Sequence, residues 1–501
     1  MAKIVIVGGG VSGLSAGIYL AMAGHDATIC ERHKIAGGNL TGWRRQGCVI
    51  DNCIHWLTGT NPATDTYKTW VELGALGGVS IKKCDSLYTY SDGERSISLC
   101  RDLDALEAKL LKISPSDRGR IKSLMKAVRL VQYFSGIGGK SHDERARPAD
   151  YLGAAVRLGV YAVRSTGELA DGFKSELIQG FLRSFLGDDF TSLALITVFA
   201  HFTADNADLP EGGSIAMADR MVRKFKSSGG KLLCGCEVVG SIKSRDRLKG
   251  VMLASGEVIE ADYFIFACDP EPVFKSILSR PVPMRLGACY KKEAMSRFSS
   301  YQAAFLCSRE ALPFKGDYIF APEDKYKRPL HCERLILREF SHEPRFAPGG
   351  CSIIQTMTFL GEEASRAFID LRNADKHKYD AKKARLAKHL EGAICHRFPT
   401  LNGTLRLLDI WTPATYERYT GSKTGSYMSF LLPKSTLPSA LGATVPGIKN
   451  AYLATQWQRA PGGLPVAAEM GKRCAQKIIA RESTVQGSVN ERVSRRAKEA
   501  T

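Results

Sequence analysis

The 501-residue sequence predicts an α/β protein in which a central parallel sheet, built from separated stretches of chain, carries an inserted α+β domain. Three stretches predict the sheet, because each combines a short apolar run of strand type with a glycine-rich turn and an amphipathic helix. They lie within residues 3–31, 210–266 and 447–479. We expect the sheet domain to comprise residues 1–65, 208–275 and 441–480, the inserted domain residues 66–207 and 276–440, and residues 481–501 a mobile basic tail.

The first stretch, KIVIVGGGVSGLSAGIYLAMAG, predicts a buried strand, a tight turn and a helix that ends near Met22. Gly8, Gly10 and Gly13 follow the spacing G-x-G-x-x-G, in which glycines let the backbone approach a pyrophosphate at the positive end of the helix. A second strand ends at Glu31, and an acid roughly 20 positions after the turn accepts hydrogen bonds from ribose hydroxyls. The stretch therefore predicts a Rossmann-like domain for an adenine dinucleotide.

A second glycine pair, Gly37-Gly38, permits another backbone turn close to a ligand. The strand GCVID then ends at Asp51, and His55 follows shortly after it. A histidine here is either a buried structural residue or a ligand contact, and the sequence alone leaves both open. We keep His55 as a candidate for cofactor binding and for catalysis.

This N-terminal segment resembles the FAD-dependent oxidoreductases related to phytoene desaturase, carotenoid isomerase and retinol saturase, within the flavin-containing amine oxidase superfamily. The resemblance implies that the cofactor is FAD and that the glycine-rich turn and Glu31 hold its ADP half. Further cofactor-binding candidates near this half are Ser12, Arg32, Gly37, Gly38 and Asn39. The family often has a basic residue where this chain has Asn39, and a glycine where it has Cys53, so the subgroup stays open.

The later stretches complete the expected cofactor domain. LPEGGSIAMADRMVRKFKSSGGKLLCGCEVV predicts a helix over about 214–226 and a strand over 231–238, and the resemblance implies that Val238 contacts adenine through its backbone. GIKNAYLATQW predicts the last strand, and a Pro-Gly-Gly turn leads into a helix over 464–479. We expect the start of this helix to face the flavin edge that becomes negative on reduction.

The family usually has Gly-Asp where this chain has Thr455-Gln456, and Gln456 can still bond ribityl or phosphate oxygens without a charge. The remaining cofactor-binding candidates are Gln456, Gly463, Leu464, Pro465 and Val466.

The inserted half predicts helices first, in SLMKAVRLVQYF, DYLGAAVRLGVYAV and ELIQGFLRSFLG, and then strands and a long helix, which together suit a cavity above the flavin. The segment DIWTPATYERYTGSKTGSYMSF alternates aromatic residues with threonine and glycine and resembles a family segment near the flavin. Its tyrosines either line the cavity or pack normally. Tyr416 and Tyr419 are the catalytic candidates from it.

Composition and charge limit the kinds of partner that we expect the protein to bind. There are 70 basic and 51 acidic residues, a net charge of +19 that is spread along the chain. Such spread charge is typical of a solvated surface, with attraction to an anionic membrane face as the alternative. The sequence has no nucleic-acid-binding motif and no metal-binding spacing among its 14 cysteines, which indicate reduced thiols. With a strand at the start, no signal peptide and no long apolar run, we expect a cytoplasmic protein, peripheral on the inner membrane face at most.

An apolar cavity over a flavin suits hydride transfer at a carbon–carbon bond of an alkene-bearing lipid, such as a polyene or isoprenoid. Desaturation, saturation and isomerisation all fit, with oxygen, a quinone or another protein as the electron partner. The alternatives are a flavin amine or porphyrinogen oxidase on the same fold and, without enzyme activity, a prenyl-lipid carrier similar to the GDP dissociation inhibitors. The intact phosphate turn and Glu31 argue against the carrier.

Overall fold

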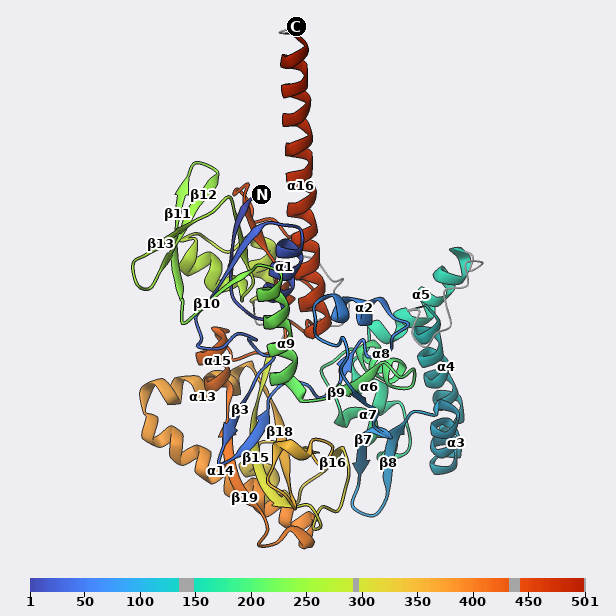
Figure 1. Cartoon of the computed structure of the whole chain (residues 1–501). Helices are drawn as coiled ribbons and strands as arrows, with labels where there is room; N and C mark the ends of the chain where they lie inside the picture. The colour runs from blue at the N-terminus through green and yellow to red at the C-terminus, as the bar shows by residue number, and fades with distance from the viewer. Residues whose placement is uncertain (135–147, 292–296, 432–441, 500–501) are drawn as a thin grey trace.

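The computed structural model describes residues 1–134, 148–291, 297–431 and 442–499. Figure 1 shows one sheet with its helices at the top, a larger sheet at the bottom and a group of helices at the side. The expected domain boundary at residue 441 and residues 500–501 of the expected tail lie outside the described residues.

The upper domain is built on a five-stranded sheet in which every neighbouring pair is parallel. Its strands, in spatial order, are β10 (Lys231–Cys234), β2 (Asp26–Glu31), β1 (Lys3–Val7), β14 (Tyr263–Phe266) and β20 (Ala451–Leu453). Strands from all three expected stretches therefore lie side by side, and their carboxyl ends share one edge, where α/β sheets bind ligands.

Both faces of this sheet are covered, because successive strand residues point to opposite sides. Ile4 and Ile6 belong to the core that contains α1 (Val11–Met22), α9 (Gly213–Ser227) and the start of α16 (Leu464–Glu499). Val5 and Val7 belong to a second core, under a three-stranded antiparallel sheet. That sheet comprises β11 (Val238–Ser244), β12 (Arg247–Leu253) and β13 (Val258–Glu260).

The lower domain is a mixed seven-stranded sheet. Its strands, in spatial order, are β19 (Arg406–Trp411), β15 (Phe298–Ser308), β18 (Cys351–Gly361), β17 (Leu335–Glu339), β16 (Asp317–Phe320), β7 (Ser86–Ser91) and β8 (Ser96–Cys100). The helix-rich first block that the sequence predicts also contains two strands that the sequence analysis missed, β7 and β8. They form a hairpin in that block and join the sheet of the second block through the parallel pair β7–β16.

Helices cover both faces of the larger sheet. One face packs against α13 (Glu362–Ala374) and α14 (Lys376–Arg397), and α12 (Asp324–Leu330) and α15 (Pro413–Thr420) lie nearby. The other face packs against the helical group. That group comprises α3 (Leu103–Ile113), α4 (Arg118–Phe134), α5 (Pro148–Ala162), α6 (Thr166–Asp171), α7 (Glu176–Ser184) and α8 (Ser192–Phe202), whereas α2 (Asp65–Glu72) packs into the core of the upper domain through Trp70.

Short elements complete the described fold. They are β3 (Gly42–Arg45), β4 (Cys48–Asp51), β5 (Leu57–Thr58), β6 (Ile81–Lys82), β9 (Ala207–Pro210), α10 (Pro270–Pro272) and α11 (Met284–Cys289).

Two predicted elements have different ends. The strand expected over 231–238 stops at Cys234, because Gly235 turns the chain with a φ of +70°, and Val238 begins a strand of the neighbouring sheet. The last helix continues beyond residue 479 to Glu499, so the segment expected as a mobile tail is helical as far as that residue and extends away from the body of the molecule (Figure 1).

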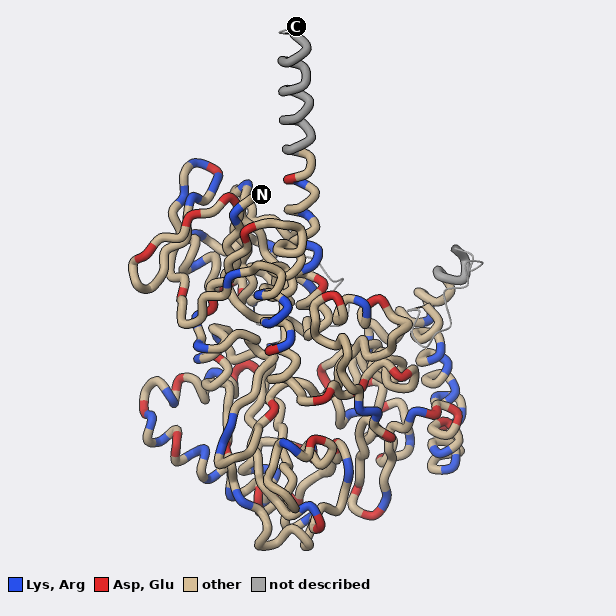
Figure 2. The backbone as a smooth tube through the Cα atoms, viewed as in Figure 1, with Lys and Arg blue, Asp and Glu red and all other residues tan. Residues whose placement is uncertain are grey.

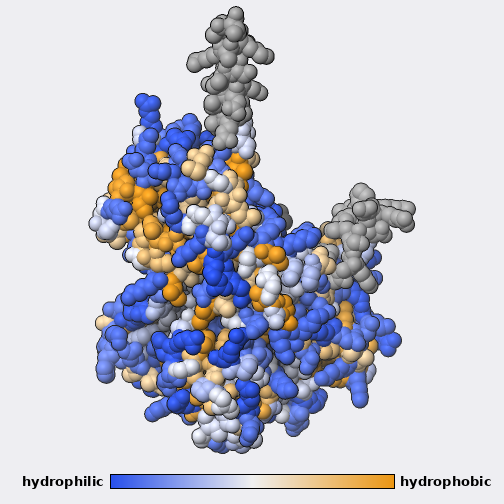
Figure 3. Space-filling view, viewed as in Figure 1, coloured by the Kyte–Doolittle hydropathy of each residue, from blue (hydrophilic) through white to orange (hydrophobic). Residues whose placement is uncertain are grey.

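The surface is mixed in charge and hydropathy. Lys and Arg and, less often, Asp and Glu are scattered along the backbone trace (Figure 2). Figure 3 shows apolar residues gathered over the β11–β13 sheet, where Val239, Ile242, Met252 and Val258 are all exposed. All 14 cysteines are free thiols. Among the described residues, no helix combines the length and the apolar character needed to cross a bilayer.

Candidate functional site: a dinucleotide cradle between two sheets

The glycine-rich turn is shaped by backbone packing. A Cβ atom on Gly13 would lie 2.0 Å from the carbonyl oxygen of Gly8, so only glycine lets α1 pack on β1. Gly8 itself has a φ of +104°, which favours glycine. A Cβ on Gly10, in contrast, would have no protein atom nearer than 3.8 Å. The glycine at position 10 therefore keeps open a space that protein atoms do not use.

The start of α1 lies at this space. No side chain caps the helix at Gly10, so its first backbone N–H groups remain available to an anion. The Ser12 hydroxyl does not point to this space, since it donates to the carbonyl of Ala467 at 2.9 Å and ties α1 to α16. The Ser12 hydroxyl proton is thus used within the protein, and the cofactor contact of Ser12 stays a prediction.

Glu31 is buried at the carboxyl end of β2. Its two oxygens accept hydrogen bonds from Gly9 N at 2.8 Å and His33 N at 2.7 Å. These bonds fix the carboxylate and leave further lone pairs for ribose hydroxyls. Arg32 points elsewhere: its guanidinium donates to the backbone carbonyls of Glu417 and Arg418 and holds the end of α15.

A chain of hydrogen bonds links the cradle to the C-terminal turn. Gly37 N donates to Gly9 O, and Asn39 Nδ2 donates to the carbonyl of Tyr427 at 3.3 Å. The amide of Gln456 also donates to that carbonyl, at 3.1 Å, and its Oε1 accepts from Gly463 N at 2.9 Å. The Gln456 side chain thus braces the protein itself, which leaves its predicted ligand contact untested.

The start of α16 borders open space. Gly463 has a φ of +96°, and no atom lies within 4 Å of the place where its Cβ would stand. The first helical bond runs from Ala467 N to Gly463 O, so the N–H groups of Leu464 and Val466 precede it, and Pro465 has none to lose. Val238, the predicted adenine contact, is buried at the start of β11.

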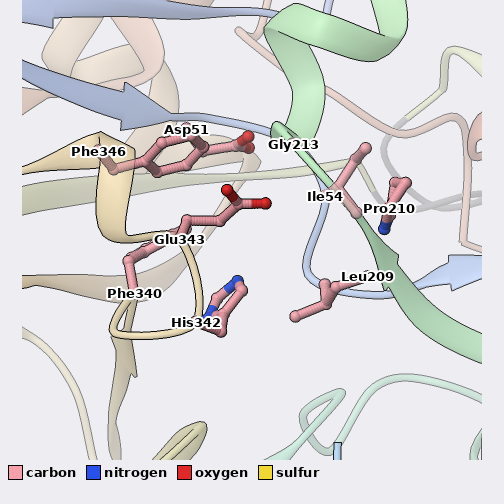
Figure 4. A pocket seen from close by; sticks show the side chains of 9 residues that line it. All are labelled: Asp51, Ile54, Leu209, Pro210, Gly213, Phe340, His342, Glu343 and Phe346. Carbon is pink, nitrogen blue, oxygen red and sulfur yellow. The ribbon is translucent and has the colours of Figure 1, made fainter. Parts of the chain in front are cut away.

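A small pocket lies at the start of α9 (Figure 4). Asp51 accepts from the backbone and the hydroxyl of Ser214, both at 2.6 Å, and Glu343 accepts from Gly212 N at 2.7 Å. Burial raises the pKa of Glu343 and lowers that of His342 beside it. Two acids from different domains therefore cap one helix, which joins the upper and lower sheets.

His55 lies against the larger sheet. Its Nδ1 is 3.9 Å from Oδ2 of Asp317, whose carboxylate is paired with Arg338 at 2.7 and 3.0 Å. Arg338 also donates to the carbonyls of Ile54 and His55 and so fixes this loop on the sheet. Burial, with Arg338 nearby, lowers the pKa of His55, which favours a neutral imidazole.

The two tyrosine candidates separate in the structure. Tyr416 is buried, and its hydroxyl donates to Asn52 Oδ1 at 3.0 Å and accepts from Gln302 and Trp411 at 2.8 and 3.0 Å. Tyr419 is 42% exposed and contacts Arg418 and His33, away from this group. Tyr427, rather than Tyr419, lies beside Tyr416, with ring centroids 5.3 Å apart.

A family model described as flavin containing amine oxidoreductase matches residues 11–307. The chain belongs to this family. It is 23% identical to the hydroxyneurosporene desaturase of Rubrivivax gelatinosus, over 95% of this chain and 93% of that protein. It is 24% identical to the zeta-carotene-forming phytoene desaturase of Myxococcus xanthus, a match that spans 55% of each chain. A redesigned putrescine oxidase shares the fold, with a TM-score of 0.60, 16% identity and coverage of 96% of this chain and 99% of that chain.

The protein is thus an FAD-dependent oxidoreductase of the flavin containing amine oxidoreductase family, with the α/β fold that the sequence predicts. Buried side-chain atoms around the cradle fit such a cofactor, because they lack a hydrogen-bond partner among the described residues. They are Asn39 Oδ1, Asp269 Oδ2, Arg297 Nη1, Ser422 Oγ, Thr424 Oγ1 and Ser429 Oγ. Buried polar groups are rarely left unpaired, and the phosphates, ribityl hydroxyls and ring heteroatoms of FAD offer partners. The individual contacts remain predictions.

Sequence reasoning missed several polar residues of the site, among them Ser300, Gln302, Asp317 and Arg338. They lie on long strands and carry no motif. The only signal was the alternation in FSSYQAAFLCS, which places residues 300 and 302 on one face of β15.

Proposed function

We propose that this FAD-dependent oxidoreductase acts on carbon–carbon bonds of an apolar, alkene-bearing lipid, by desaturation, saturation or isomerisation. The observation that carries the proposal is an apolar cluster directly beside the cradle. It contains Phe190, Phe298 and Leu431, with Phe359, Tyr427 and Met428 against it. Tyr427 belongs to both regions, because its backbone carbonyl binds Asn39 and Gln456 of the cradle.

Bound FAD supplies the hydride chemistry, and the protein residues supply orientation and electrostatics. The N–H groups at the start of α16 favour negative charge next to the open space at Gly463. Neutral His55, close to Asp317, is available to hold a substrate proton that leaves or returns. The apolar cluster excludes water from a bound alkene.

The relatives support the substrate class by name only. They include a zeta-carotene-forming phytoene desaturase and a hydroxyneurosporene desaturase, to which the chain is 24% and 23% identical. Anaerobic mixing of the oxidised and of the reduced holoenzyme with polyene, isoprenoid, fatty-acid and amine panels tests the proposal. Reaction with polyenes or isoprenoids, seen in the flavin spectrum, supports it, and reaction with amines alone refutes it.

Amine oxidation is the second candidate, since the family description names amines. Porphyrinogen oxidation belongs to the same class of alternative. The hydrogen-bond partners of Tyr416 give a cationic amine no counter-charge, because Asn52, Gln302 and Trp411 are all neutral. The carrier alternative is not retained, because the family is one of flavin enzymes.

We further propose a cytoplasmic enzyme that docks reversibly on an anionic membrane face and exchanges electrons with oxygen, a quinone or a protein. The support is the +19 charge and a lipid substrate. Flotation with anionic and neutral liposomes at low and high salt tests docking. Binding that ignores lipid charge and salt contradicts it.

A further inference from the structure

A neutral polar cluster lies within the otherwise apolar region beside the cradle. Gln302 Nε2 donates to Ser300 Oγ at 3.0 Å and to the Tyr416 hydroxyl at 2.8 Å, and Tyr416 donates to Asn52. Ser300 and Gln302 are 0% and 2% exposed. We call Asn52, Ser300, Gln302, Tyr416 and Tyr427 the neutral cluster.

The cluster joins the cofactor domain to the large sheet, because Asn52 belongs to the first and Ser300 and Gln302 lie on β15 of the second. Gln302 pairs with Met357 on one neighbouring strand and Trp411 on the other, and Ser300 pairs with Phe359. These strand neighbours are apolar or aromatic. Two buried polar side chains at adjacent same-face positions of such a sheet cost desolvation free energy, and packing alone gives no reason for them.

Tyr427 connects this cluster to the cradle. Its carbonyl accepts a hydrogen bond from Asn39 of the cradle. Its ring packs against the rings of Tyr416 and Phe298, with centroid distances of 5.3 and 5.5 Å. Its hydroxyl is buried and has no partner of hydrogen-bond geometry in the described ranges, although Ser300 approaches it. Leaving such a donor unpaired costs about 1–3 kcal/mol, so a bound ligand atom is its natural partner.

The charge state of the cluster limits what that atom can be. Burial raises the pKa of both Tyr416 and Tyr427, so both hydroxyls stay protonated. The side chains that form hydrogen bonds with Tyr416 are neutral. Arg338, on β17 of the same sheet, already forms an ion pair with Asp317. A carboxylate or an ammonium group would therefore lack a counter-ion here, whereas a hydroxyl or carbonyl oxygen would need none.

We infer that the substrate is a lipid with a neutral oxygen function, a hydroxyl or a carbonyl, which the Tyr427 hydroxyl binds while the hydrocarbon chain lies on the Phe298 side. This inference rests on the proposed lipid function and narrows it. The unpaired Tyr427 hydroxyl should favour an oxygenated lipid over a hydrocarbon, because a site that forms a hydrogen bond with a substrate oxygen rejects the analogue without that oxygen.

The test uses the FAD-loaded, full-length protein and three polyenes matched in length and double bonds: an alcohol, an aldehyde and a hydrocarbon. Each is titrated anaerobically, and its Kd is read from the perturbation of the flavin spectrum. For the wild type we expect the alcohol or the aldehyde to bind at least about tenfold more tightly than the hydrocarbon. In Tyr427→Phe the three Kd values should converge, with the hydrocarbon unchanged.

Tyr133→Phe is the matched control, since Tyr133 lies on α4, outside the cluster. If Tyr427→Phe does not retain FAD, Gln302→Met provides the second variant and should also reduce the preference for oxygen. Wild-type binding of all three polyenes with equal Kd overturns the inference and leaves the lipid proposal standing. Spectral response to amines, and to none of the lipids, overturns both.

Discussion

The candidate sites at the two sheets are built from different kinds of groups. At the five-stranded sheet, backbone forms most of the candidate site, with glycines at 8, 10 and 13, a helix start and an open turn at Gly463, and Glu31 adds a carboxylate. At the seven-stranded sheet, the site is made of side chains brought together from distant strands, such as Gln302 with Tyr416 and Arg338 with Asp317. A shared cofactor suits the first design and a variable substrate the second.

This difference predicts what decides the effect of a substitution in each domain. In the cofactor domain the damage should depend on whether a new Cβ meets protein or open space. In the sheet domain it should depend on whether a buried partner is left alone.

The largest effect is expected at Arg338, which is 6% exposed and paired with buried Asp317. Arg338→Met should lower the free energy of unfolding by about 3–5 kcal/mol, because it leaves an unpaired carboxylate in the interior. Chemical denaturation measures the loss.

The double variant Arg338→Met/Asp317→Leu is the control for that experiment and should be more stable than Arg338→Met alone. A single variant as stable as the wild type would show that the pair is not a side-chain anchor of this sheet.

The second effect compares Gly13 with Gly10. Gly13→Ala forces a Cβ to within 2.0 Å of the Gly8 carbonyl and should destabilise the apoprotein by about 1–3 kcal/mol or more. Gly10→Ala meets no atom within 3.8 Å and should leave the apoprotein stable, yet weaken FAD binding at least about tenfold, or 1.4 kcal/mol. Thermal melts and FAD titration separate the two, and equal melts would contradict the comparison.

A third effect belongs to Gly463. Its φ of +96° strains any L-residue by about 1–2 kcal/mol, although no atom occupies the Cβ position. Gly463→Ala should therefore fold with a modest loss of stability and, if α16 begins at the flavin, change FAD affinity and reduction potential. Gly463→Val should enlarge both flavin effects. An unaltered flavin spectrum and potential in the two variants would remove the helix start from the cofactor site.

The smallest net effect is on pH dependence, because the two domains oppose each other. Burial lowers the pKa of His201 on α8 to about 4, so the unfolded chain takes up more protons between about pH 6.5 and 4, and stability falls on acidification. Burial raises the pKa of Asp269 to about 6, so the folded apoprotein takes up more protons between about pH 4 and 6, and stability rises there.

Unfolding of the apoprotein across pH 4 to 7 exposes each contribution through one substitution. His201→Gln should lessen the acid-induced loss, and Asp269→Asn should steepen it, by about 1 kcal/mol or more each. The same slope in both variants as in the wild type would rule out these two groups.

The sequence predicts the cofactor half well, since its strands and turns are encoded by local runs. Gly8, Gly13 and Glu31 have the expected structural surroundings, whereas Ser12 and Arg32 have side chains engaged in packing between elements. Such tertiary uses leave no local signal.

The other half was harder to predict because its pairing is remote. The hairpin of β7 and β8 has a readable Asp92-Gly93 turn, but its partner β16 lies more than 220 residues later. The placement of Tyr416 and Tyr419 could not be separated from sequence, because the choice depends on how α15 packs against Asn52 and Gln302.

The contact between α1 and α16 limits how far the N-terminal helix can pack during synthesis of the protein. Ser12 and Ser15 donate to the carbonyls of Ala467 and Ala468, and a Cβ on Gly471 would lie 2.3 Å from the Ser12 carbonyl. During synthesis, α1 therefore cannot pack against α16 until residues 464–471 have left the ribosome. A nascent chain that stops before residue 464 therefore lacks the two carbonyls to which Ser12 and Ser15 donate, and one face of α1 stays uncovered in it.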